Sequence, residues 1–121
     1  MTASLDQCPV LVVVYAMHEC PACEHYLPRL LSEVAALQAQ GYPFIVYEAG
    51  TALSPNAIPV LVFDAATEDG NVQRFADRFG VTATPTTIIA LRNGGGAKYE
   101  GALANNQILQ VLMMANEEAN R

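Results

Sequence analysis

An abrupt change of hydrophobic pattern separates residues 10–15 from residues 22–40. The first segment reads Val-Leu-Val-Val-Val-Tyr, an apolar run without polar alternation. Such a run is typical of a strand buried on both faces, as in a mostly parallel sheet covered by helices. In the second segment apolar residues recur at spacings of three and four, which predicts an amphipathic helix that Gly41 ends. A buried strand followed at once by a helix indicates an α/β architecture.

The rest of the chain alternates between strand and helix patterns. Four further strands are predicted, at residues 44–48, 58–64, 86–91 and 98–100. A short helix has Asn71 or Asp69 as its candidate N-cap, and a last helix has Asn105 or Asn106. We expect residues 116–121 to be a frayed tail. The order β-α-β-β-α-β-β-α predicts a central mixed sheet with helices on both faces.

Composition limits the class of protein. Of the 121 residues, 52% are hydrophobic and 15% charged, which excludes disorder and predicts a single domain over residues 1–121. Twelve acidic against six basic side chains argue against nucleic acid bound through a basic patch and against an anionic membrane surface. The longest apolar run is too short to span a membrane. No lysine or arginine precedes Arg29, so we find no secretory signal and expect a cytoplasmic protein.

The motif Cys20-Pro21-Ala22-Cys23 lies between the predicted first strand and first helix. Unpaired N–H groups and the positive end of the helix dipole stabilise a thiolate and lower a cysteine pKa there. The spacing puts both sulfurs on one helical face, close enough for a reversible disulfide. Cys20, on the loop side, is the candidate nucleophile. Cys23, one turn into the helix, is the candidate resolving thiol.

Two other interpretations of the cysteine pair are open. The pair is half of a zinc site, although the only other cysteine is Cys8 and only His18 and His25 flank the motif. Alternatively, both cysteines are small core residues without a role. The position between a strand and a helix favours redox chemistry over both. Glu19 and Glu24 disfavour a thiolate, whereas protonated histidines favour it.

The third cysteine stands apart from the motif. Cys8 precedes the first predicted strand and Cys20 follows it. A strand of about nine residues spans roughly 30 Å, so the two cannot pair within one chain. We expect Cys8 to be a structural or incidental thiol.

Taken in chain order, the motifs resemble the thioredoxin superfamily. The resemblance covers most of residues 11–112, apart from residues 41–59. Its elements are the Cys20-Pro21-Ala22-Cys23 motif after the first core strand, Pro28 inside the following helix, the acid–short helix–aromatic-Gly-Val passage over residues 64–81, the Thr84-Pro85-Thr86 turn, and the hairpin from Asn93-Gly94 to Gly101.

The resemblance implies a thioredoxin-like fold and a thiol–disulfide oxidoreductase that acts on proteins. It implies that Cys20 is the nucleophile, that Cys23 resolves the mixed disulfide, and that Pro85 is a cis-proline beside them. That proline would keep metal off the thiols and turn the Thr84 backbone toward a bound peptide. The implied substrate-binding residues are Pro21, Ala22, Thr84 and Pro85. No cofactor or metal is implied beyond the Cys20–Cys23 disulfide, and the implied partners are protein disulfides or dithiols and a reductase or oxidant.

The chain also departs from the family. Ala16 and Glu19 stand where thioredoxins carry tryptophans, and Val14 stands at their buried acid, with Val60 as the match for its lysine partner. These changes leave open a non-catalytic interaction or assembly component. The proline after the first cysteine, with Tyr15 upstream, resembles glutaredoxin and leaves open a glutathione-linked enzyme. Whether the protein reduces or oxidises depends on a potential that the motif does not specify.

Overall fold

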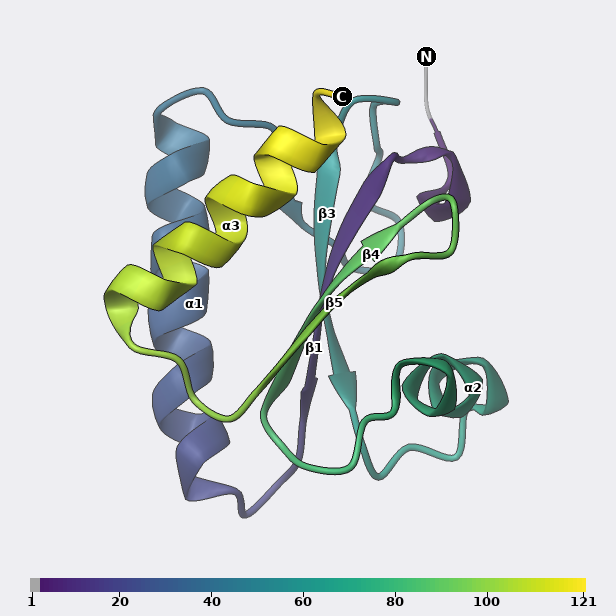
Figure 1. Ribbon diagram of the computed structural model, residues 1–121, viewed down its shortest axis with the longest axis vertical. Coiled ribbons are helices and arrows are strands. Elements are labelled where there is room, and N and C mark those ends of the chain that lie inside the picture. Colours follow the sequence, from purple (N-terminus) through teal and green to yellow (C-terminus); the bar gives the residue numbers. More distant parts are fainter. Residues whose placement is uncertain (1–2) are drawn as a thin grey trace.

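A computed structural model describes residues 3–121 and contains one five-stranded sheet with helices on both faces (Figure 1). After a 3-10 helix at Leu5–Gln7, the elements are β1 (Val10–Ala16), α1 (Pro21–Ala39), β2 (Phe44–Val46), β3 (Ile58–Asp64), α2 (Gly70–Phe79), β4 (Thr86–Leu91), β5 (Gly96–Glu100) and α3 (Asn105–Ala119). The strand order is β2-β3-β1-β4-β5. β1, β2 and β3 run parallel, whereas β4 and β5 pair antiparallel. The predicted mixed sheet with helices on both faces is confirmed.

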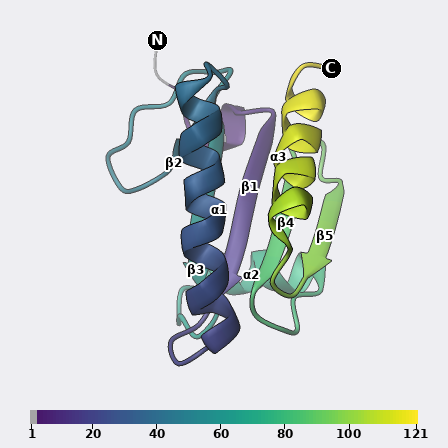
Figure 2. The ribbon, with the colours of Figure 1, turned by 90° about the vertical axis from the view of Figure 1, so that its left-hand side faces the viewer.

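The two faces of β1 enter two separate cores, which explains its unbroken apolar sequence. On one face, Val12 and Val14 pack beneath α1 and α3, which lie side by side in Figure 2. On the other face, Val13 and Tyr15 pack against Phe75 and its neighbours on α2. β1 is therefore the central strand, with β3 on one side and β4 on the other. Its carboxyl end leads directly into the loop before Cys20.

The bounds of β1, α1 and β5 differ by one or two residues from the sequence prediction. Three further differences have a structural reason. β2 stops at Val46, because only three of its residues pair with β3. The N-cap of α3 is Ala104, whose N–H donates to the side chain of Gln107, and not Asn105 or Asn106. The predicted frayed tail is also wrong. α3 continues to Ala119, because apolar contacts with the core hold its last turns.

The start of α2 provides a direct test of capping. The carboxylate of Asp69 accepts hydrogen bonds from the N–H groups of Asn71 at 2.9 Å and Val72 at 3.4 Å. We expect Asp69→Ala to lower the free energy of unfolding by about 1 kcal/mol. Urea denaturation measures this value. Asp77→Ala is the control, since Asp77 is exposed near the other end of the same helix, and an equal loss there would contradict a capping role.

Tyr15 should make the fold less stable as the pH rises into the alkaline range. Burial raises the pKa of its phenol from 10 to about 12, and its hydroxyl donates to the carbonyl of Val72 at 2.6 Å. Because the folded state favours the neutral phenol, its contribution is complete below pH 10 and is lost as pH rises from 10 through about 12. We expect urea midpoints to fall over that range, and to fall less steeply in Tyr15→Phe. An equal slope in both proteins would contradict this assignment.

Candidate functional site

Cys20 occupies the N-cap of α1, and its position follows from the local backbone. After β1 ends at Ala16, Glu19 takes a left-handed conformation with φ of 56°, which is uncommon for a residue other than glycine. Pro21 then starts the helix at a position where its missing N–H costs nothing. The Sγ atom of Cys20 accepts a hydrogen bond from the N–H of Cys23 at 3.2 Å. A thiolate at Cys20 would receive the same bond together with the positive end of the helix dipole.

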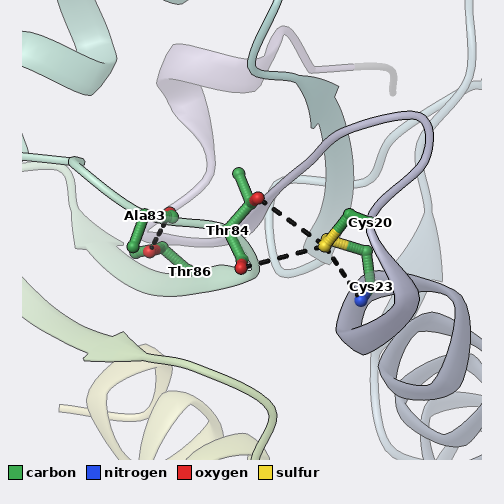
Figure 3. Close-up of a disulfide and its surroundings, with 5 residues drawn as sticks. All are labelled: Cys20, Cys23, Ala83, Thr84 and Thr86. Atoms are coloured by element: carbon green, nitrogen blue, oxygen red, sulfur yellow. Dashed lines mark hydrogen bonds between the residues drawn. A yellow bond between two sulfur atoms is a disulfide. The ribbon is translucent and has the colours of Figure 1, made fainter.

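Cys20 and Cys23 form a disulfide across the first turn of α1, with their Cα atoms 5.2 Å apart (Figure 3). Cys20 is half-buried, whereas Cys23 is only 2% exposed. Pro21 and Ala22, between them, are exposed. The sulfur of Cys20 is thus the more accessible to a second molecule. This difference in exposure is the arrangement expected for an attacking and a resolving cysteine.

The turn before β4 approaches the disulfide from the side of the sheet. The Sγ atom of Cys20 lies 3.9 Å from the carbonyl oxygen of Thr84 and 3.7 Å from its hydroxyl oxygen (Figure 3). The Thr84–Pro85 peptide bond is cis, and Pro85 is buried. The carbonyl of Pro85 accepts from the N–H of Gly101 at 2.8 Å, and the hydroxyl of Thr86 donates to the carbonyl of Ala83 at 2.7 Å. These bonds fix the turn so that Thr84 faces Cys20.

Four ionisable residues flank the motif, and all of them are exposed: His18, Glu19, Glu24 and His25. Neither histidine makes a hydrogen bond to Cys20 among the described residues. The polar contacts of the Cys20 sulfur therefore come from the N–H of Cys23 and from Thr84.

Glu19, directly before Cys20, gives a test of the local electrostatic field. Its carboxylate disfavours a second negative charge on the neighbouring thiolate. We expect Glu19→Gln to increase the rate at which iodoacetamide alkylates reduced Cys20 at neutral pH by about twofold to threefold. Glu33→Gln, with its substitution more than three helical turns away, should leave the rate unchanged. A rate in Glu19→Gln at or below that of the native protein would contradict the expectation.

Cys8 lies far from this chemistry. It is 2% exposed and packs against Leu53 and Ala57 in a small cluster below the N-terminal segment. Burial raises the pKa of its thiol. A buried, protonated thiol reacts slowly, which fits a structural residue.

Two structural findings concern groups elsewhere in the chain. Within residues 3–121, no helix is both long enough and apolar enough to cross a membrane. Over that range, too, no three side chains of His, Cys, Asp or Glu are grouped so that they could hold a metal ion.

The positions of the family's buried acid and lysine are occupied by apolar residues. Val14 is completely buried in the core beneath α1. The register of β1 and β3 places Val62 opposite Val14, whereas Val60 lies opposite Val12. The direct neighbour of Val14 on β3 is therefore Val62, and Val60, the predicted match for the family's lysine, lies two residues before it on the same face. Because all three are valine, the structure brings no carboxylate–ammonium pair to this place.

A pocket beside Cys23 was not predicted from the sequence. It encloses about 370 Å³ and lies between α1 and the carboxyl ends of β1 and β3. We call it the Cys23 pocket; its lining includes Ala16, Met17, Cys23, Glu24, Val62 and Asp64. The small side chain of Ala16, where the family has a tryptophan, was the one signal in the sequence that could have indicated it.

Comparisons with known proteins agree with this architecture. The chain is similar to malaria parasite thioredoxin-2, a component of a protein secretion machinery, with 17% identity, a TM-score of 0.58 and coverage of 88% of this chain and 82% of that one. It is similar to Fasciola hepatica thioredoxin, with 16% identity, a TM-score of 0.56 and coverage of 91% and 84%. It is also similar to a thioredoxin-like protein from Clostridium perfringens, with 15% identity, a TM-score of 0.60 and coverage of 88% of this chain and 71% of that one. No curated protein matches the sequence.

These structural neighbours establish the fold, since their identities are low. The family assignment comes from the sequence itself, because the model of the thioredoxin-like domain matches residues 2–116. Together with the Cys20–Cys23 disulfide, this match indicates a redox type of function. The chain belongs to the thioredoxin-like family.

Proposed function

We propose that this protein is a thiol–disulfide oxidoreductase that exchanges disulfides with protein substrates through Cys20 and Cys23. The observation that carries the proposal is the Cys20–Cys23 disulfide at the start of α1, with Thr84 in contact with its more exposed sulfur. A helix N-terminus stabilises the thiolate that such a reaction uses and releases.

In the reducing direction the reaction has two steps. The thiolate of Cys20 attacks one sulfur of the substrate disulfide, forms a mixed disulfide and releases the other substrate sulfur as a thiolate. Cys23 then gives its proton to water, and its thiolate attacks the Sγ atom of Cys20. This step forms the Cys20–Cys23 disulfide and releases the second substrate thiolate. Two electrons have moved from the protein to the substrate, and an external dithiol must restore the reduced protein. The oxidising direction is the reverse.

The turn at Thr84 supports binding of an extended peptide. The carbonyl oxygen of Thr84 lies beside Cys20 and precedes a buried proline, so a substrate strand can pair with this backbone. The exposed surface of Pro21 and Ala22 completes the contact around the attacked sulfur. We assign substrate binding to Pro21, Ala22, Thr84 and Pro85.

The test is a redox titration of the purified protein. Samples are equilibrated in dithiothreitol buffers of defined potential, alkylated, and weighed by mass spectrometry. We expect a single reversible two-electron transition that involves Cys20 and Cys23 and leaves Cys8 reduced. The absence of a reversible transition would refute the proposal. The same samples in glutathione buffers separate the glutaredoxin-like alternative, which requires rapid reduction by glutathione.

Val14 and Val60, both completely buried, favour one second candidate, a non-catalytic interaction or assembly component. With Val14 and Val60 at the positions of the family's acid and lysine, residues 3–121 include no buried acid that could take the proton of Cys23. Replacing both cysteines with serine distinguishes the candidates. A cellular role that survives the double substitution supports the interaction component, and a role that is lost supports the oxidoreductase.

A further inference from the structure

We infer that the Cys23 pocket is a second docking site for the substrate, which takes an apolar side chain from a polypeptide segment rich in lysine or arginine. The inference rests on the proposed function and specifies its substrate class. It concerns a surface distinct from the Thr84 turn.

The sheet order places this pocket and the Thr84 turn on opposite flanks of the disulfide. β1 leads to the cysteines, β4 and its preceding turn lie on one side of it, and β3 lies on the other. Val62 and Asp64 are alternate residues of β3, so both point to the face that α1 covers. The pocket therefore opens beside Cys23, where a chain that crosses the disulfide from Thr84 would arrive.

The walls of the pocket are suited to an apolar group. Met17 is 44% exposed and Val62 is 41% exposed, although both are large apolar side chains. Leu27 and Phe63 contribute further apolar surface. A volume of about 370 Å³ lies at the lower end of the range for ligand pockets, which is enough for one side chain. Exposed apolar side chains gathered beside a reactive group mark an interaction site.

The charges that line the pocket favour basic residues next to the bound apolar side chain in the substrate sequence. Glu24 and Asp64 line the pocket, and the N–H of Ala66 donates to the Asp64 carboxylate at 2.9 Å and so holds it in place. His18 is the only basic side chain in the lining. Two cations elsewhere are already engaged. Arg29 donates to the carbonyl of Leu103, and Lys98 is paired with a glutamate of its own strand.

The resulting field is negative, in keeping with a net charge of -6. It attracts a cationic segment and repels an acidic one. Selectivity for an apolar side chain and selectivity for cationic residues can therefore be measured separately. Added salt screens the charge attraction but does not weaken the apolar contact.

The experiment measures single-turnover reduction of four synthetic peptides by the pre-reduced protein. Each peptide has one cysteine, supplied as a symmetrical disulfide dimer. The peptides combine lysine or glutamate next to the cysteine with leucine or glycine two residues away. Samples are quenched by alkylation and quantified by chromatography. At low salt we expect the lysine–leucine peptide to react about tenfold faster than the glutamate–leucine peptide, and about threefold faster than the lysine–glycine peptide.

Each rate is divided by the rate of the same peptide with dithiothreitol, which removes intrinsic differences between the peptides. The ratio of lysine to glutamate peptides is then compared between variants, because a ratio cancels changes in the reactivity of Cys20. We expect the double variant Glu24→Gln/Asp64→Asn to bring this ratio close to one. The matched control is Glu33→Gln/Glu117→Gln, which changes net charge equally at distant positions and should keep the ratio.

Val62→Ser tests the apolar part of the site and should reduce the advantage of leucine over glycine. An unchanged charge ratio in Glu24→Gln/Asp64→Asn, or the same loss in the control double variant, would overturn the inference and leave the proposed function intact. Failure of every peptide to react, even at high salt, would count against the proposed function itself.

Discussion

Replacing Cys23 with serine is expected to stop the reaction at the mixed disulfide between Cys20 and the substrate. The serine hydroxyl is not ionised near neutral pH and does not attack a disulfide, so the second step cannot proceed. Cys20 keeps its place at the helix N-cap and its contact with Thr84. We therefore expect Cys23→Ser to capture substrate covalently, while turnover falls about 1,000-fold, which corresponds to about 4 kcal/mol in the barrier.

Two companion variants make this result specific. Cys20→Ser should neither turn over nor capture substrate, because it lacks the attacking sulfur. Cys8→Ser should behave like the native protein, since Cys8 is buried in a separate cluster. Non-reducing electrophoresis and mass spectrometry of the trapped species measure the outcome. Capture by Cys20→Ser at the level of Cys23→Ser would assign the roles the other way round and contradict the difference in exposure of the two sulfurs.

Much of this fold could be predicted because its local signals agree with its tertiary structure. The apolar run of residues 10–15 indicated burial on both faces, and β1 proved to be the central strand. β3 and β4 have the bounds that their apolar patterns predicted. Asp69 was one of the two caps proposed for α2. In each case the residue types that form the element also suit the place where it packs.

The wrong predictions arise where tertiary contacts override local composition. The polar end of α3 suggested a frayed tail, yet Ala115 is fully buried and Ala119 packs against the core. Likewise, two asparagines suggested an N-cap for α3, but the helix starts one residue earlier and uses Gln107. Neither outcome follows from the helix propensities of these residues, since both depend on where the β4–β5 hairpin places the start of α3.

The candidate site divides in the same way. The cysteine pair could be predicted because it is local in sequence, and the Thr84–Pro85 turn because it resembles a family motif. The Cys23 pocket could not, because it combines residues from β1, β3 and α1 that only the sheet register brings together. Register also identifies Val62 as the direct neighbour of Val14, since a residue two positions along a strand keeps the same face but has another neighbour.

The β1–β3 register around Val14 supports a second test, in which a large effect on the free energy of unfolding is expected. Val14 is fully buried in the core beneath α1. We expect Val14→Asp to lower the free energy of unfolding by about 4 kcal/mol at pH 7, because a carboxylate is placed in an apolar core without a partner. Urea denaturation at several pH values measures this loss.

The pH dependence of the loss identifies its cause. Burial raises the pKa of the introduced carboxyl above its unfolded value of about 3.9. A raised folded pKa means that stability is greatest below the unfolded value and is lost as pH rises through the folded value. The loss in Val14→Asp should therefore shrink to about 2 kcal/mol near pH 4. Val14→Asn, which cannot ionise, should show a loss with little dependence on pH.

Addition of Val62→Lys should restore part of the stability at pH 7. Val62 lies opposite Val14 in the β1–β3 pair and is 41% exposed, so an ammonium there can face the introduced carboxylate and still contact water. Val60→Lys is the matched comparison, because Val60 is completely buried and opposite Val12. A rescue by Val60→Lys equal to that by Val62→Lys would contradict the register. A loss in Val14→Asp that does not change with pH would show that its cause is misfit in the core and not a buried charge.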